Sequence, residues 1–263
     1  DVTPSGAEAS LLFYDAKGKK GVDLGLKADI MENGYRLHFT PLNPIIAYRR
    51  FQLNEDNFVA LTNDMRIEGL VDLLADDGTG LKFYSTEGDA LQDLSLSVNR
   101  FNLGELTQVI PYMPSIGGFL HGDLHYVQAD STTLSISTDM TVQGMTYKGA
   151  PLGQVGLNAV YLPNNDGTHY VDGIVTQNNA EVMTLNGMYQ SKQDGGHIDA
   201  EAQLRRLPLS LANGFIPDGM ATMQGYVSGD MEVQGPTRNP LLSGMLATDS
   251  MALVSVPYNL NLR

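Results

Sequence analysis

Two histidines four residues apart, in His121-Gly122-Asp123-Leu124-His125, are the residues of this chain that most resemble a metal-binding pair. The surrounding sequence predicts a strand, on which residues four apart share a face. They then lie about 13 Å apart along that face, which is too far for two ligands of one ion. The spacing argues against a metal site, and we predict that the chain holds no metal.

An acidic stretch next to glycine, from Asp72 to Gly80, has the composition of a calcium loop. It lacks the alternating Asp and Asn ligands and the closing Glu of an EF-hand. Its Asp76-Asp77-Gly78 sequence is typical of a hairpin turn, which accounts for these residues without an ion.

Motifs for catalysis are also missing from the sequence. It contains no Gly-x-Ser-x-Gly elbow, no phosphate-binding loop and no His-Glu-x-x-His, and its five histidines are scattered. The acidic pair Asp76-Asp77 falls in a predicted turn, where water screens the carboxylates and gives no reason for a shifted pKa. We therefore expect neither enzyme activity nor a cofactor.

The elements that must carry these residues are strands. Apolar and polar residues alternate along the chain, as from Leu24 to Ile30 and from Ile198 to Leu204, which is typical of a strand with one dry face and one wet face. Turn sequences separate the runs and predict local antiparallel hairpins. These turns are Lys17-Gly18, Asn33-Gly34, Asp76-Asp77-Gly78, Asn164-Asn165-Asp166-Gly167 and Gln193-Asp194-Gly195-Gly196.

A block of sequence occurs twice, with Arg100 and Arg206 as equivalent positions 106 residues apart. The first copy contains Gly118 and Gly122, and the second contains Gly225 and Gly229. Glycines at this spacing in a strand predict a bulge or a closely approaching backbone. The repeat favours a continuous array of similar β units.

Two places break the alternation. The stretch from 102 to 114 spaces its apolar residues at helical intervals before prolines end it, and the stretch from Leu209 to Pro217 matches it in the second copy. We predict a short helix in each that caps or plugs the end of the sheet. The predicted segments are 1–93, an N-terminal β segment; 94–199, a first repeat unit with a helix at 102–114; and 200–263, a second, truncated repeat unit, with no linker between them.

Composition excludes some classes of partner. The chain has 30 acidic and 16 basic residues and a net charge of −14, which disfavours nucleic acid and anionic bilayer surfaces. It has no cysteine, so a disulfide framework is impossible, and it has no apolar run of the roughly 20 residues that a spanning helix needs. Alternation continues to the last residue, so we expect the chain to be a segment of a longer protein.

Several glycine and apolar patterns resemble those of the TamB family (translocation and assembly module subunit) in the AsmA-like superfamily. The resemblance runs from about Asp64 to the C-terminus, and Arg66-Ile67-Glu68-Gly69 is similar to the Bacteroidetes type. The stretches that carry it are Ile216 to Gly219, Met223 to Pro236, Asn239 to Leu246, Met145 to Tyr161 and Leu185 to Tyr189.

What the resemblance implies is the periplasmic portion of a Gram-negative envelope protein, with an inner-membrane anchor outside this chain. It also implies an outer-membrane β-barrel of the Omp85 type as partner. Members of the family have a long U-shaped β sheet, the β-taco, with an apolar concave face. They are associated with movement of phospholipid between the two membranes and with assembly of outer-membrane proteins.

Together these features predict an all-β fold, an elongated antiparallel curved sheet that forms an apolar groove, with short helices between repeat units. Our leading hypothesis is that the groove shelters or conducts phospholipid acyl chains. The alternatives are a chaperone-like scaffold that pairs its strand edges with outer-membrane proteins, and a surface adhesin or carbohydrate-binding array, which the absence of Trp disfavours. The groove-lining candidates are Leu94, Leu96, Val98, Leu134, Ile136, Met140, Val142, Val155 and Leu157.

Overall fold

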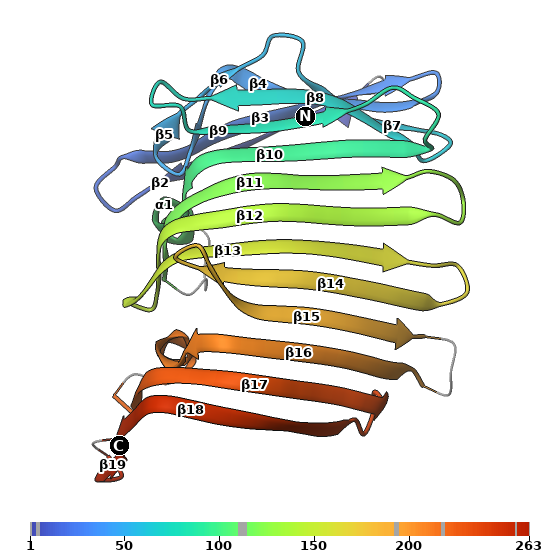
Figure 1. The fold of residues 1–263 in the computed structure, drawn as a ribbon. Coiled ribbons are helices and arrows are strands. Elements are labelled where there is room, and N and C mark those ends of the chain that lie inside the picture. Colours follow the sequence, from blue (N-terminus) through green and yellow to red (C-terminus); the bar gives the residue numbers. More distant parts are fainter. Residues whose placement is uncertain are drawn as a thin grey trace. The chain divides into compact units, whose positions relative to one another are not determined.

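The computed structural model describes residues 2–3, 6–109, 115–191, 195–216, 219–255 and 257–262 (Figure 1). Strands make up most of these residues, and two short helices interrupt them. The prediction of an all-β protein with a curved, open antiparallel sheet and short helices is confirmed. Within the described part of the chain, no helix has the length and apolar character needed to cross a membrane.

The chain divides into two compact units. The N-terminal unit comprises residues 1–113 and 119–131, and the C-terminal unit comprises residues 114–118 and 132–263. The predicted segment boundaries after residues 93 and 199 stay predictions.

The N-terminal unit is an antiparallel sheet in which most strands pair with their neighbours in sequence. Strand β4 pairs with both β5 and β7, and β6 pairs with β8. The elements are β1 (Val2–Thr3), β2 (Gly6–Tyr14), β3 (Lys20–Met31), β4 (Gly34–Ile46), β5 (Arg49–Arg50), β6 (Gln52–Leu53), β7 (Phe58–Thr62), β8 (Ile67–Leu74), β9 (Gly80–Ser85), β10 (Gln92–Asn102), α1 (Leu103–Val109) and β11 (Ile116–Gln128), of which Phe119 onward belongs to this unit.

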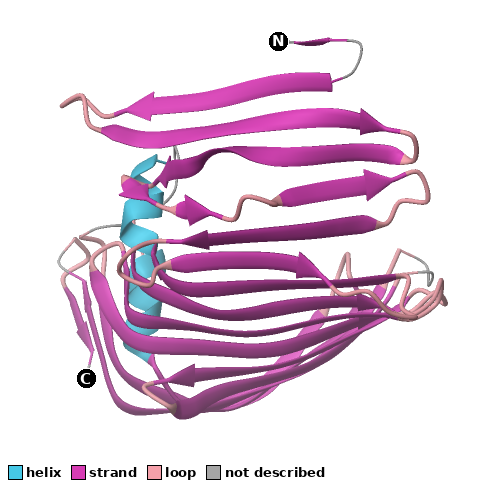
Figure 2. Cartoon of the chain, turned by 90° about the horizontal axis from the view of Figure 1, so that it is seen from above, coloured by secondary structure: helices cyan, strands magenta, loops and turns pink. Residues whose placement is uncertain are grey.

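The C-terminal unit is a meander in which every successive pair of strands is antiparallel. Its strands bend along their length (Figure 2). The elements are β12 (Leu134–Tyr147), β13 (Ala150–Pro163), β14 (Thr168–Gln177), β15 (Ala180–Gln190), β16 (His197–Pro208), the 3-10 helix η1 (Leu209–Phe215), β17 (Thr222–Pro236), β18 (Leu241–Ser255) and β19 (Leu260–Leu262).

Residues opposite each other in an antiparallel pair lie on the same face of the sheet. The pairing register therefore joins the alternating apolar and polar residues of neighbouring strands into two continuous faces. In each unit one face is apolar and the other is polar. An apolar row of the N-terminal unit is Val71, Phe83, Leu96 and Leu124, and the neighbouring polar row is Asp72, Lys82, Ser97 and Asp123. In the C-terminal unit the matching rows are Met140, Leu157, Val175, Met183 and Leu204 against Asp172, Asn186, Glu201 and Glu232.

Hairpin turns occur where the sequence predicts them. Gly18, Gly78 and Gly167 have φ angles of 77°, 82° and 88°, which glycine adopts without strain. The Asn33-Gly34 turn joins β3 to β4. Of the fifth predicted turn, Gln193 and Asp194 lie outside the described part of the chain, and Gly195 and Gly196 precede β16.

The repeated block builds the same β-bulge in both units. Arg100 and Arg206 have φ angles of 52° and 50°, and the register shifts by one residue beside each of them. The backbone N–H of Arg100 is 3.4 Å from Nδ1 of His121, and that of Arg206 donates to Oγ of Ser228 at 2.8 Å. His121 and Ser228 occupy equivalent positions in the two copies, so each supplies an acceptor that supports a bulge.

Each bulge keeps the apolar side chains on one face. Val98 pairs with Gly122, and the next paired residue, Phe101, pairs with Leu120. Phe101 is three positions after Val98, an odd number, so without the bulge their side chains would point to opposite faces. The extra residue restores Phe101 to the apolar face.

The two predicted helices are present, and both are short. Helix α1 covers residues 103–109, and residues 110–114 of the predicted helix lie outside the described part of the chain. Oδ1 of Asn102 accepts hydrogen bonds from the backbone N–H groups of Gly104 and Glu105 at 3.0 and 3.3 Å, as an N-cap does. In the second copy the structure is the 3-10 helix η1, and Pro217 lies outside the described residues.

The repeated glycines generate a prediction on stability. Gly229 has a φ angle of 139°, and a Cβ atom at this position would overlap the carbonyl oxygen of Met245 on β18. We expect Gly229→Ala to lower the free energy of unfolding by about 1–3 kcal/mol in urea denaturation.

Gly173→Ala is the matched control in the same unit, because the nearest atoms to a Cβ there are 3.7 Å away. Its free energy of unfolding should change by about 0.5 kcal/mol or less. Equal losses in the two variants would contradict a special backbone requirement at Gly229.

Candidate functional site

The apolar face of the N-terminal unit is covered at one end of β10 and open at the other. At the covered end, Phe51, Ala75 and Phe101 are buried, and Val98 packs against them. The rings of Phe51 and Phe101 stack with their centroids 6.0 Å apart. This end of the face is therefore the protein's own core.

The open end of β10 lines a hollow of about 470 Å³, which we call the β10 hollow. Its apolar residues are partly exposed, and Met65, in the β7–β8 turn, is 74% exposed. The described residues that line it are all uncharged: Met65, Ile67, Phe83, Gln92, Leu94, Ser95, Leu96, Leu124, Tyr126 and Gln128. This volume lies within the range of small-molecule sites in proteins, and most of the lining is apolar.

The register explains how side chains from β9, β10 and β11 meet in the β10 hollow. Leu96 lies opposite Phe83 on one side and opposite Leu124 on the other. Gly69 of β8 has no side chain, and a Cβ atom there would collide with the ring of Phe83. The glycine therefore allows the Phe83 ring to lie against the sheet.

Gln92 closes the sheet at the outer end of the hollow. Its Oε1 accepts a hydrogen bond from the N–H of Ile67 at 2.7 Å, and its Nε2 donates to the carbonyl oxygen of Ile67 at 2.6 Å. The side chain is buried, and its amide pairs with Ile67 as the backbone of a neighbouring strand would. The backbone N–H and carbonyl groups of Ile67, at the start of β8, are thereby hydrogen-bonded.

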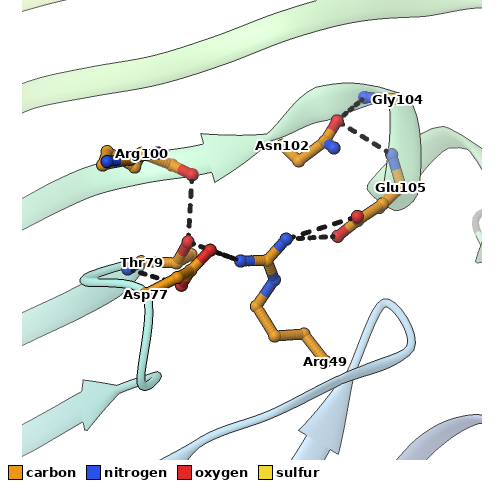
Figure 3. Close-up of polar contacts among 7 residues, drawn as sticks. All are labelled: Arg49, Asp77, Thr79, Arg100, Asn102, Gly104 and Glu105. Carbon is orange, nitrogen blue, oxygen red and sulfur yellow. Dashed lines mark hydrogen bonds and ion pairs between the residues drawn. The ribbon is translucent and has the colours of Figure 1, made fainter.

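The covered end of the N-terminal unit is fastened by Arg49, which follows the β4–β5 turn (Figure 3). Its guanidinium forms an ion pair with Asp77, donates to Oγ1 of Thr79 at 2.9 Å and lies 3.3 Å from both carboxylate oxygens of Glu105. Oγ1 of Thr79 donates to the carbonyl oxygen of Arg100 at 3.3 Å. These bonds connect β5, the β8–β9 turn, the bulge and α1.

These contacts correct the expectation for the acidic turn. The hydrogen bond from Arg49, aided by the backbone N–H and hydroxyl of Thr79, holds the pKa of Asp77 well below its ordinary value. The sequence reasoning was wrong here because Arg49 is 28 residues away and only the fold brings it to the turn. The stretch from Asp72 to Gly80 does form the predicted hairpin, between β8 and β9.

The structure separates the predicted groove-lining residues into three groups. Leu94 and Leu96 line the β10 hollow, whereas the half-buried Val98 packs against the core. In the C-terminal unit the other six share one face of β12 and β13, where Met140 lies opposite Leu157. These six residues are Leu134, Ile136, Met140, Val142, Val155 and Leu157.

Other lining residues escaped the sequence analysis, notably Met65, Phe83, Leu124 and Tyr126. The alternating runs that contain Phe83 and Leu124 were a usable signal, since they predict one apolar face for each strand. The order and register of the strands decide which of these faces become adjacent. Met65 lies in a turn, where alternation gives no information.

Helix η1 covers one end of the apolar face in the C-terminal unit. It contacts both β17 and β13. Three strands, β14 to β16, separate β13 from β17 in the sheet. Val227 on the apolar face of β17 is buried at 8% exposure, in contrast to the exposed Tyr226 on the opposite face.

Asn213 holds η1 at the start of β17. Its Oδ1 accepts a hydrogen bond from the N–H of Met223 at 2.7 Å, and its Nδ2 donates to the carbonyl oxygen of Met223 at 3.0 Å. The amide pairs with Met223 as a strand backbone would, which is the same device as Gln92 in the N-terminal unit.

The two histidines that open the sequence analysis have separate partners. Nε2 of His125 lies 2.8 Å from Oδ1 of Asp93, and Nδ1 of His121 lies 3.2 Å from Oδ1 of Asn99. Among the residues that the structure describes, no three His, Asp or Glu side chains form a group that could hold a metal ion.

A second hollow, of about 400 Å³, lies on the polar face of the C-terminal unit. Asp172, Asp199 and Glu201 contribute to its lining together with Leu162 and Tyr170. Three carboxylates make this hollow unfavourable for anionic molecules.

Comparison of the chain with protein-family models, with curated proteins and with solved structures finds no match. The resemblance to the TamB family therefore continues to rest on its sequence motifs alone.

The Arg49 contacts generate a prediction on pH dependence. Because the pKa of Asp77 is lowered in the folded state, its contribution to stability is present above the ordinary carboxyl pKa and is lost as the pH falls through the folded value. Arg49→Met should lower the free energy of unfolding at pH 7 by about 1 kcal/mol or less, since Asp77 is half exposed. It should also weaken the loss of stability on acidification below about pH 5.

Urea denaturation at pH 7, 5 and 3 measures both effects. Arg50→Met is the matched control, because Arg50 is the exposed next residue of the same strand. An Arg49→Met protein with the wild-type pH profile would show that the ion pair does not set the pKa of Asp77.

Proposed function

We propose that this chain is a lipid-handling segment of an envelope protein, which shelters or conducts phospholipid acyl chains along the apolar face of its sheets. The observation that carries the proposal is the β10 hollow. A single strand, β10, packs the half-buried Val98 against the core and leaves Leu94 and Leu96 at an open apolar surface. An acyl chain is the kind of ligand that such a surface removes from water favourably.

The register supports the proposal over a wider area. Apolar rows extend without a charged residue from β8 to β11 and from β12 to β16. The residues of these rows are mostly half-buried rather than sealed beneath a second sheet. An acyl chain therefore meets a continuous apolar surface within each unit.

The resemblance to the TamB family adds the setting. On this proposal the chain lies in the periplasm of a Gram-negative bacterium, is anchored to the inner membrane by a segment outside this sequence, and works with an Omp85-type barrel. Phospholipid then passes between the inner and outer membranes. The proposal needs no cofactor and no nucleic acid.

Carboxylates placed on the apolar face test the proposal. Leu96→Asp and Met140→Asp should each lower the amount of phospholipid that co-purifies with the chain at least fivefold, because an acyl chain cannot satisfy a buried carboxylate. Native mass spectrometry after gentle purification from a Gram-negative host, followed by organic extraction, measures the bound lipid.

Thr141→Asp is the matched control, because Thr141 follows Met140 on the opposite face and pairs with Gly156, which leaves room for the new side chain. Circular dichroism and urea denaturation establish that each variant is folded. Full lipid retention by a folded Leu96→Asp, Met140→Asp double variant would sink the proposal.

A second candidate function is supported by the edge of β18. The ten residues from Leu241 to Ser250 are all exposed, and β18 pairs with β19 only at Leu253 to Ser255 in the described part of the chain. An exposed edge of this length is a template for another strand. The alternative proposal is a chaperone-like scaffold that binds strands of outer-membrane proteins at this edge.

Proline substitution distinguishes the two edges of β18. Neighbouring N–H groups of a strand point to opposite edges. Of Met245→Pro and Leu246→Pro, one should break a bond to β17 and destabilise the protein by about 2–3 kcal/mol. The other should remain stable and lose strand binding at least tenfold.

A synthetic peptide with the sequence of residues 150–163 is the probe for strand binding. This peptide corresponds to β13, which pairs with β12, and β12 is the counterpart of β18 in the repeat. Fluorescence anisotropy of the labelled peptide measures its affinity. Absence of binding to the wild-type chain would count against the scaffold function.

A further inference from the structure

The β10 hollow changes from apolar to polar along the direction of its strands. Its innermost row consists of Phe83, Leu96 and Leu124, beside the closed core. The next row contains Leu94 and Tyr126, and the outermost row contains Gln92 and Gln128. Successive rows on one face are about 7 Å apart, so the change takes place over about 14 Å.

This order of side chains matches a molecule with one apolar end and one polar end. The core lies beyond the innermost row of the hollow, where Val98 packs with Phe101 and Phe51. The outer end carries the phenol of Tyr126 and the amide of Gln128, whose oxygens are 3.5 Å apart. A bound amphiphile therefore has its tail at the inner end and its head group at the outer end.

The charges select the class of head group. The described residues that line the hollow are all uncharged, and the whole chain has a net charge of −14. An anionic head group finds no counter-charge here and is repelled by the protein at low ionic strength. Hydroxyl groups, in contrast, form hydrogen bonds with amide and phenol groups at no electrostatic cost.

We propose that the β10 hollow is a binding site for a single acyl chain with an uncharged, hydroxyl-bearing head group, such as a monoacylglycerol. The tail packs on Phe83, Leu96 and Leu124, and the head group lies at Tyr126 and Gln128. This inference rests on the proposed function, since both require acyl chains to bind the apolar face. It adds the position of the site, the orientation of the ligand and the class of head group.

Tryptophan fluorescence reports on this site without background, because the chain contains no Trp. Tyr126→Trp places the reporter at the outer end of the hollow. Tyr84→Trp is the matched control, because Tyr84 follows Phe83 on β9, its side chain is on the opposite face, and it does not line the β10 hollow. Each protein is titrated with lauroyl glycerol brominated either beside the carbonyl group or at the end of the chain.

The expected result is at least twofold quenching of the Tyr126→Trp protein, stronger with bromine beside the carbonyl group than with bromine at the chain end. The fluorescence of the Tyr84→Trp protein should stay unchanged. Brominated laurate, with its carboxylate head, should bind at least fivefold more weakly at low salt, and this difference should shrink at 0.5 M salt.

Substitutions within the Tyr126→Trp protein locate the tail. Leu124→Gln should weaken binding at least fivefold, whereas Leu157→Gln, on the apolar face of the C-terminal unit, should leave the affinity unchanged. Circular dichroism verifies that both variants are folded. Equal effects of the two substitutions would overturn the assignment to the β10 hollow.

Native mass spectrometry of the same samples separates this inference from the proposed function. A lauroyl glycerol adduct of the Tyr126→Trp protein without quenching of its fluorescence would overturn the site while leaving lipid handling in place. The absence of a lauroyl glycerol adduct from the wild-type chain would overturn both. Tighter binding of laurate than of lauroyl glycerol would overturn the choice of an uncharged head group.

Discussion

The two-residue period of the antiparallel strand is the constraint on which this protein depends. Every apolar residue of a strand stays on the same face only if the register with both neighbours is kept, and a slip of one residue exchanges the faces. The row from Val71 through Phe83 and Leu96 to Leu124 is the result of three registers that agree. Without that agreement there is no apolar face, and neither the core nor the β10 hollow forms.

The bulges at Arg100 and Arg206 adjust this constraint rather than break it. Each adds one residue to its strand and returns the following apolar side chain, Phe101 or Leu207, to the apolar face. Glycine at 122 and 229 provides the backbone conformation that the partner strand needs. The repeat in the sequence therefore corresponds to a bulge of the same geometry in each copy. His121 and Ser228 differ in type, but each places a hydrogen-bond acceptor beside the backbone N–H of the bulge.

Short segments decide how much of the apolar face is left for a ligand. In the N-terminal unit, β5, β6 and α1 meet the sheet beside Phe51 and Phe101, and Arg49 fastens them through Asp77 and Glu105. In the C-terminal unit, η1 has a comparable role through Asn213. The apolar face is thus part core and part open surface, and the open part is the basis of the proposed lipid-handling function.

The sequence by itself determined the all-β class, the sites of the hairpins, the two short helices and the repeated glycines, because alternation, Asn-Gly or Asp-Gly turns and glycine spacing act over a few residues. Only the tertiary structure decided that Leu94 and Leu96 line an open hollow while Val98 packs against the buried Phe51 and Phe101, since all three are half-buried, have the same alternation and differ only in what lies beside them. It also decided the lowered pKa of Asp77, because Arg49 reaches that turn from a distant strand. Contacts of this kind join residues far apart in the chain, and no local pattern encodes them.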